Sequence, residues 1–349
     1  MDYQGLARIG KLPFPVDREL MDAEISNEIG KIDTWGCSPR DELSVIKINS
    51  CFMELVDRWY SHKGHAIFYS CGPFVIGSLF IVVVAMLAFE MNEVDIWWVF
   101  LLSFVMGGGL LLFGWTMFRC EAFQLTHYPV RFNRKNRMVY AILPHGGIAK
   151  AKWDDLFIYL ATNRVSFFRR PFYEIRAHVL ADDRKTVLQT FSLAYPIWGE
   201  RDHALGMWEF IRRYMDEPTG YKRNSELVEL CMPIDKKRER LSFCIIRGMA
   251  IFASSQAIQL IMSPLFVLVI WGRMVAIYTS KVPEWPADIA SQCHAPKNDP
   301  YAKTGEDNTP FTFFEGTWPI ICFCMGSLIS ISIITWAAYT YAGMIMALF

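Results

Sequence analysis

The side chains with the most specific chemistry in this sequence are its histidines and cysteines. Seven histidines lie at 62, 65, 127, 145, 178, 203 and 294, and nine cysteines lie at 37, 51, 71, 120, 231, 244, 293, 322 and 324. His62 and His65 could share a metal ion, but no cysteine or carboxylate completes a ligand set beside them. The cysteine count is odd and no pair has zinc-finger spacing. We therefore predict neither a metal site nor a disulfide framework.

Motifs of the common enzyme classes are missing from the sequence. It contains no GxSxG, HExxH, P-loop or dinucleotide-binding pattern. His145 follows Pro144 and precedes Gly146 and Gly147, where a solvated turn residue is expected. We predict a protein that is not an enzyme, with no catalytic residue and no cofactor.

Three consecutive glycines, Gly107, Gly108 and Gly109, lie within a long charge-free run. Glycine weakens a helix in water, but in lipid it lets a second helix approach closely. Tight packing of two membrane helices is the simplest interpretation, and we favour it over a gating hinge. The same residues are candidate contacts for a helix of a partner protein.

Basic residues are concentrated in residues 119–240, which hold 22 Lys and Arg against 15 Asp and Glu. Each such charge near an anionic membrane surface contributes about 1 kcal/mol of attraction. A positive-inside bias combined with solubility explains the excess equally well. The candidate lipid contacts are Arg134, Lys135, Arg137, Arg169, Arg170, Lys236, Lys237, Arg238 and Arg240.

Composition favours a membrane protein. Of the 349 residues, 53% are apolar and 20% are charged, and the mean hydropathy is +0.20. Soluble domains carry about 25% charged residues, so some segments here must be nearly charge-free. The formal net charge is zero, which argues against a nucleic-acid-binding protein.

The first two membrane spans are predicted with little ambiguity. Residues 67–89 and 96–118 carry no charge, and each is long enough to cross a hydrocarbon core of about 30 Å. Only six residues join them. The two spans therefore form an antiparallel hairpin over residues 67–118.

The later apolar segments are less regular. Residues 241–271 contain Arg247, Gln256 and Gln259, so we predict an interfacial helix followed by a third span. Those three side chains are also the best candidates for a solute or ion pathway, which is our weakest functional hypothesis. Residues 318–349 carry no charge and form the fourth span.

Orientation follows from the basic residues that flank the spans. The hairpin loop holds Glu90, Glu93 and Asp95 with no base, whereas Arg119 and several further bases follow the second span. The positive-inside rule then places the N-terminus and residues 119–240 in the cytoplasm. If residues 241–271 cross fully, residues 272–317 form a periplasmic loop.

Residues 119–240 form the expected folded domain of the chain. Short strands are predicted at 122–128, 130–132, 137–143, 148–153, 173–180 and 186–194. An amphipathic helix follows over residues 204–215, with Trp208 on its apolar face. Antiparallel strands closed by one helix are typical of a pleckstrin-homology-like barrel, and a generic α+β domain is the alternative.

The N-terminal 66 residues are predicted to form a cytoplasmic helical region. From Asp41 to Trp59 the apolar residues Val45, Ile48 and Phe52 share one face of a helix. We expect this helix to pack on the folded domain or to lie at the membrane surface.

Several stretches together resemble a known family. They are CEAFQLTHYPVRFNRKNRMVYAI (120–142), the Trp153-Asp154 step, VLADDRKTVLQTFSL (179–193), the helix from Trp208 to Met215, and SKVPEWPADIASQC (280–293). Over roughly residues 119–300 the chain is similar to an uncharacterised family of proteobacterial membrane proteins encoded beside type VI secretion genes and their toxic effectors. The resemblance implies an immunity or effector-accessory role and carries over no site residues.

The sequence thus predicts an inner-membrane immunity protein that binds a cognate type VI secretion toxin. A membrane-anchored scaffold that binds lipid or protein is the alternative. The expected partners are the toxin and membrane lipid, with a second copy of the chain as a further candidate and no nucleic acid.

Overall fold

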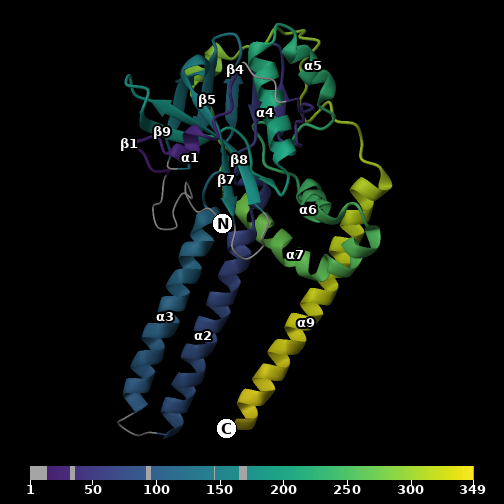
Figure 1. Ribbon diagram of the computed structural model, residues 1–349. Coiled ribbons are helices and arrows are strands. Elements are labelled where there is room, and N and C mark those ends of the chain that lie inside the picture. Colours follow the sequence, from purple (N-terminus) through teal and green to yellow (C-terminus); the bar gives the residue numbers. More distant parts are fainter. Residues whose placement is uncertain (1–13, 32–35, 92–95, 145, 165–170, 349) are drawn as a thin grey trace. The chain divides into compact units, whose positions relative to one another are not determined.

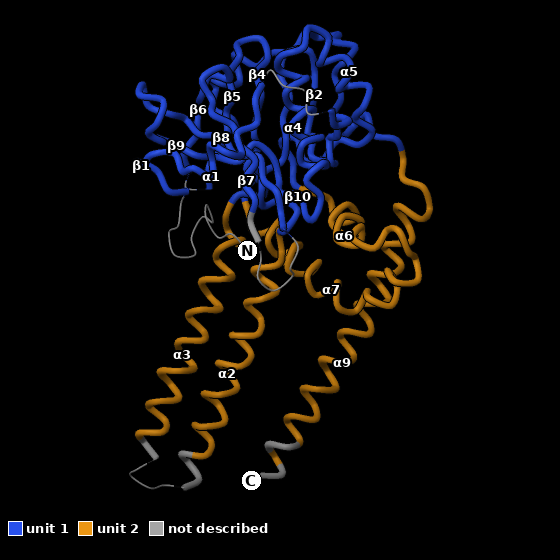
Figure 2. The backbone as a smooth tube through the Cα atoms, in the orientation of Figure 1, with its two compact units in different colours: residues 1–62, 125–238, 281–309 blue, residues 63–124, 239–280, 310–349 orange. Residues whose placement is uncertain are grey.

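The computed structural model describes residues 14–31, 36–91, 96–144, 146–164 and 171–348. The chain forms two compact units (Figure 2). One unit, here called the sheet unit, comprises residues 1–62, 125–238 and 281–309. The other, the helical unit, comprises residues 63–124, 239–280 and 310–349. The chain therefore passes from one unit to the other several times.

The first sheet of the sheet unit is an antiparallel meander. Its strands are β2 (Val45–Ile48), β3 (Phe52–Leu55), β4 (Val130–Asn133), β5 (Met138–Ile142) and β6 (Ile148–Lys152), paired in that order. Strands β3 and β4 are neighbours, with Phe52 opposite Asn133 and Leu55 opposite Val130. A long apolar excursion of the chain is thus inserted between two strands that pair directly.

The predicted helix over residues 41–59 is wrong, because this segment forms the β2–β3 hairpin. Every residue of both strands is buried, so the apolar residues show no strand alternation. Lys47 and Glu54 are buried together with the apolar residues, so the alternation that identifies a half-buried strand is missing from the sequence. The side chain of Asn49 accepts hydrogen bonds of 2.9 Å from the backbone N–H groups of Cys51 and Phe52, which stabilises the turn.

The second sheet contains β1 (Arg18–Glu19), β7 (Phe157–Arg164), β8 (Pro171–Leu180), β9 (Thr186–Ser192) and β10 (Ile197–Trp198). Strand β8 is central and pairs antiparallel with β7, β9 and β10, while β1 pairs with the outer edge of β9. The short helix α1 (Asp22–Ile25) follows β1. The strands predicted after residue 129 match observed ones, but residues 122–128 form no strand.

The main core of the sheet unit lies between the sheets and helix α4 (Arg201–Asp216) (Figure 1). This helix begins about one turn before the predicted helix over residues 204–215. Trp153 and Trp208 are fully buried and stack with ring centroids 5.7 Å apart. The indole N–H of Trp153 donates to Asp216 at 2.8 Å. Helices α5 (Gly220–Leu227) and α8 (Ala287–Gln292) complete the unit. The antiparallel α+β character is as predicted, and the pleckstrin-homology-like barrel stays a prediction.

Residues 281–309 belong to the sheet unit, whereas the sequence predicts that they are part of a separate loop over residues 272–317. The periplasmic side of that loop stays a prediction. The N–H of Thr126 donates to the carbonyl of Lys281 at 2.8 Å, and the N–H of Lys303 donates to the carbonyl of Ile48 at 2.8 Å. Segments joined by direct backbone hydrogen bonds cannot lie on opposite faces of a membrane. Residues 281–309 and 125–238 are therefore parts of one folded unit.

In the helical unit, α2 (His65–Met91) and α3 (Ile96–Glu121) run side by side (Figure 1). Glycines allow their close contact. A Cβ atom on Gly107 would lie 2.5 Å from Ile81 Cγ1 and 3.0 Å from the Gly77 carbonyl oxygen. The antiparallel hairpin agrees with the prediction for residues 67–118.

The remaining helices of this unit are α6 (Leu241–Met249), η3 (Ala250–Phe252), α7 (Gln256–Thr279), η4 (Phe313–Thr317) and α9 (Trp318–Leu348). Helices α7 and α9 touch closely, because a Cβ on Gly326 would lie 2.7 Å from the Ser263 carbonyl carbon. The hydroxyl of Ser330 donates to the carbonyl of Pro264 at 2.6 Å. Among the described helices, those long and apolar enough to cross a membrane are α2, α3, α7 and the continuous helix formed by η4 and α9.

The third apolar helix extends further than predicted. The sequence predicts that this span ends at Trp271 and that Arg273 lies in the following loop. In the structure, α7 continues to Thr279. Arg273 is 3% exposed. Its guanidinium pairs with Glu239 at 2.7 Å, and this partner offsets the cost of burying the charge.

Candidate functional site

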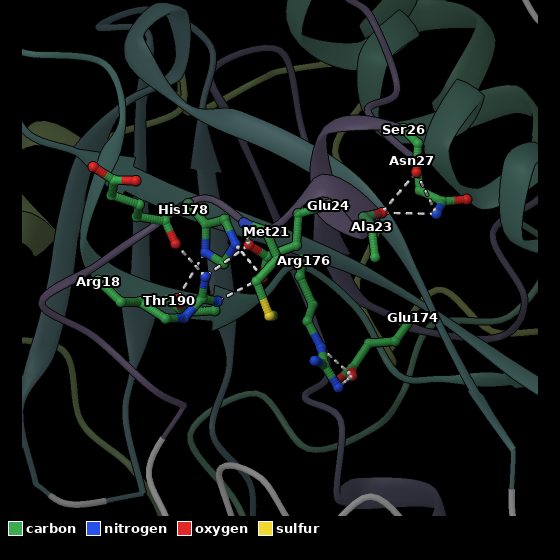
Figure 3. A network of polar contacts seen from close by, with 11 residues as sticks. Arg18, Met21, Ala23, Glu24, Ser26, Asn27, Glu174, Arg176, His178 and Thr190 are labelled. Atoms are coloured by element: carbon green, nitrogen blue, oxygen red, sulfur yellow. Dashed lines mark hydrogen bonds and ion pairs between the residues drawn. The ribbon is translucent and has the colours of Figure 1, made fainter.

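A buried network of polar side chains joins the N-terminal segment to the centre of the second sheet (Figure 3). The carboxylate of Glu24 accepts two hydrogen bonds from Arg18, at 2.6 and 2.8 Å. Its Oε1 atom also lies 3.1 Å from His178 Nε2. The other ring nitrogen of His178 lies 2.7 Å from the hydroxyl of Thr190, which is opposite it on β9. One hydrogen-bonded chain thus links four residues from β1, α1, β8 and β9.

Electrostatics fix the protonation states in this chain. Burial lowers the pKa of His178 to about 4, against the attraction of Glu24, so the imidazole is neutral at pH 7. Burial alone would raise the pKa of Glu24, but hydrogen bonds from Arg18 and the Met21 backbone lower it to about 2. A neutral imidazole therefore lies beside a carboxylate whose charge is balanced by Arg18.

A second cluster of charges lies beside this network and is also internally paired. Glu174, on β8, accepts from Arg176 at 2.7 Å and from Ser192 at 2.8 Å, and it pairs with Arg58 at 2.9 Å. The ring of Phe14 lies over both guanidinium groups, 5.3 Å from Arg58 and 4.8 Å from Arg176. The cavity beside the two clusters measures about 250 Å³.

Thr190, His178 and Glu24 follow the same order as the hydroxyl, imidazole and carboxylate of a hydrolase triad. The Thr190 residue is 7% exposed and lies within a paired strand, and His178 is fully buried. All three side chains line the 250 Å³ cavity. The pKa of His178 is about 4 and the Glu24 carboxylate is paired with Arg18, so this imidazole is a weak general base near neutral pH. We therefore interpret these contacts as cross-links that hold the N-terminal segment on the sheet.

A larger pocket, of about 520 Å³, is built around Arg131 in β4. The Arg131 guanidinium lies between two aromatic rings, 4.8 Å from the centroid of Phe52 and 4.5 Å from that of Trp285. It also donates two hydrogen bonds to Glu54, at 2.7 and 2.9 Å. The indole N–H of Trp285 donates to the same carboxylate at 3.3 Å. Trp285 belongs to the SKVPEWPADIASQC stretch, so that stretch forms one wall of this pocket.

The predicted glycine contacts divide into two kinds. Gly107 is used inside the α2–α3 pair, as its contacts with Ile81 and Gly77 show. A Cβ on Gly108 or Gly109 would meet no described atom within 4 Å. Contact of Gly108 and Gly109 with a partner helix stays a prediction.

The first basic cluster has a structural use. Arg134 and Arg137 flank the β4–β5 turn and donate to backbone carbonyls at the C-terminal end of α4 and just beyond it, including Tyr214 and Met215. Cations at this end of a helix interact favourably with its dipole. Arg137 also pairs with Asp154 and Asp216. These two arginines are therefore not free to act as a lipid-facing patch, whereas Lys135 is exposed.

The second basic cluster comes directly before α6. Lys236, Arg238 and Arg240 are exposed, and Lys237 pairs with Glu306 at 2.9 Å. Arg169 and Arg170 lie outside the described residues, as does His145. Lipid contact by any of these basic residues stays a prediction.

Two of the side chains considered for chemistry, His62 and Gln259, have local partners. His62 contacts Ser61 at 2.8 Å and the Trp198 indole nitrogen at 3.2 Å. Gln259 donates to the Met249 carbonyl at 2.8 Å. Within the described ranges, no group of three or more His, Cys, Asp or Glu side chains is arranged to hold a metal ion.

Sequence reasoning missed the residues of the buried network. Arg18 and Glu24 lie in a polar segment without periodicity, and Glu24 contacts His178 only in the folded chain. Arg131 and Trp285 lie in two of the stretches that carry the family resemblance, which is the one signal that could have drawn attention to the larger pocket.

Comparisons with known proteins are consistent with an uncharacterised family. No curated protein and no solved structure is significantly similar to the chain. A family model described as a family of unknown function, DUF6708, matches residues 109–297. The match covers more than half of the chain and includes most of the sheet unit, with both Arg131 and Trp285. This chain therefore belongs to the DUF6708 family.

Proposed function

We propose that the chain is a membrane-anchored immunity protein that neutralises a cognate type VI secretion toxin by direct binding. The observation that carries the binding role is the sheet unit, a folded body with a 520 Å³ pocket, in one chain with four apolar helices of spanning length. The family resemblance described above supports a toxin as the partner. The membrane helices would keep the binding unit where a membrane-acting toxin arrives.

The proposed location is the bacterial inner membrane, with the sheet unit in the cytoplasm. The basic excess of residues 119–240 supports this side. The pairing of β3 with β4 supports a complete excursion by α2 and α3, out and back. Contact of the exposed bases before α6 with anionic lipid headgroups is part of the proposal, because these bases directly precede an apolar helix in the sequence.

Co-expression with the toxin gene that adjoins its own gene tests this proposal. Growth should be restored, and the toxin should co-purify with the full chain in mild detergent. An unrelated four-span protein produced at the same level is the control for a general effect of membrane overproduction. Absence of both rescue and complex would contradict the proposal.

A further inference from the structure

A long groove on the sheet unit is used neither by the buried network nor by the Arg131 pocket. It lies between the N-terminal segment from Glu19 to Lys31, the start of β7 and the tip of the β8–β9 hairpin, and its volume is about 1410 Å³. This is larger than the pockets of roughly 300–1,000 Å³ that hold small molecules. Its size therefore suits a polypeptide segment better than a metabolite.

The groove carries an excess of negative charge. Seven carboxylate side chains line it against four cationic ones. Two of the cations are used internally: Arg137 pairs with Asp154 and Asp216, and Lys31 donates to the backbone carbonyls of Trp153 and Asp154.

Five acidic side chains on the groove make no ion pair with any residue in the described part of the chain. They are Glu19, Asp22, Glu28, Asp155 and Asp182, all exposed. The other two cationic side chains that line the groove are Arg184 and Lys185. The resulting negative potential attracts cationic partners and speeds their association.

Apolar side chains line the groove between these acids. Three of them are buried: Ile29, Leu156 and Ile158. A fourth, Phe157, is half-buried. Ile25 also lines it and is 52% exposed. An exposed isoleucine among unpaired carboxylates favours a ligand that has apolar and basic side chains together, because each kind of side chain would find its complement.

We propose that this groove binds an amphipathic, cationic segment of another protein. The basic side chains of the segment pair with Glu28, Asp155 and Asp182, and its apolar side chains pack on Ile25 and Phe157. The partner need not be a toxin. The groove proposal can therefore be tested separately from the proposed immunity function.

The test uses the full chain in a neutral, non-ionic detergent and a fluorescent synthetic Leu/Lys amphipathic peptide. Fluorescence anisotropy, corrected with empty micelles, should show saturable binding of this peptide and none of a matched Leu/Glu peptide. The triple variant Glu28→Gln, Asp155→Asn, Asp182→Asn should bind at least about 10-fold more weakly. Ile25→Gln should weaken binding about 3-fold or more, which separates apolar contact from charge alone.

The matched control is the triple variant Asp202→Asn, Glu226→Gln, Glu229→Gln, which removes three exposed acids that do not line the groove. It should bind the peptide within about 2-fold of the unaltered chain. Equal loss in both triple variants would show diffuse charge attraction and overturn the proposal. Failure of the unaltered chain to bind the Leu/Lys peptide would overturn it as well.

Discussion

At the residue scale, the sheet unit depends on charges that are buried together with their partners. Glu24 and Glu174 are each about 1–3% exposed, and each accepts hydrogen bonds from an arginine. Removing one partner of such a pair leaves an uncompensated buried charge, which is strongly destabilising. These residues therefore specify where the N-terminal segment and β8 lie.

His178 gives this part of the fold a dependence on pH. Its pKa falls from 6.5 in the unfolded chain to about 4 in the folded one because of burial, so the unfolded chain binds more protons between these values. The contribution of neutral His178 to the free energy of unfolding is fully present above about pH 6.5 and is lost as the pH falls towards 4. The loss attributable to His178 is of the order of 3 kcal/mol at most.

We expect His178→Gln to remove much of this acid sensitivity, because glutamine can keep a hydrogen bond and cannot gain a proton in this range. Thermal unfolding in detergent at pH 7 and pH 5 measures the effect: the midpoint should drop less in the variant than in the unaltered chain. An equal drop in both proteins would show that His178 does not control it. His294→Gln, at an exposed position, is the matched control.

At the scale of elements, neighbouring glycines of α3 differ in whether they contact α2. Gly107 faces Ile81 and the backbone of Gly77, whereas Gly108 faces no described atom within 4 Å. Leucine at position 107 would push the two helices apart, and overpacking of this kind costs about 1–3 kcal/mol. Leucine at position 108 would meet no such obstacle.

Gly107→Leu should therefore lower the stability of the chain in detergent, measured by thermal or SDS-induced unfolding, while Gly108→Leu should not. Gly108→Leu serves here as the control with the same added volume. Equal stability of the two variants would contradict the close contact. If Gly108 faces a partner helix, its variant should weaken complex formation while leaving unfolding unchanged.

At the scale of the whole molecule, the sheet unit is assembled from three separate stretches of chain. The chain leaves this unit near residue 62 and near residue 238, and it returns near residues 125 and 281. If the helical unit is inserted in a membrane, both excursions begin and end on the side where the sheet unit lies. The second excursion contains a short apolar segment, Leu241–Phe252, which comprises α6 and η3. It is followed by the longer helix α7.

This assembly changes the expected topology. If α9 crosses the membrane, its C-terminal end must lie on the side opposite the sheet unit. The periplasmic loop predicted over residues 272–317 would instead put that end in the cytoplasm. Alkaline phosphatase fused after Phe349 should accordingly be active in the periplasm. Cysteines introduced at Lys135 and Lys297, in a variant without the native cysteines, should react with an impermeant thiol reagent only after cell lysis. Labelling of position 297 in intact cells would contradict the arrangement.

The sequence by itself determined the apolar helices, the strands β4, β5, β6, β8 and β9, and most of the amphipathic helix α4, but it did not predict β7 or β10. Each depends on local features: charge-free length for α2, α3 and α9, and helical periodicity for α4. Only the tertiary structure decided the conformation of residues 41–59, because the spacing of their apolar residues fits one face of a helix as well as two strands, and β3 is identified by its pairing with β4. It also placed residues 281–309 beside Ile48 and Thr126, and Arg18 and Glu24 beside His178. Contacts between residues so distant in the chain leave no periodic pattern, because they depend on how the strands are brought together rather than on neighbours in sequence.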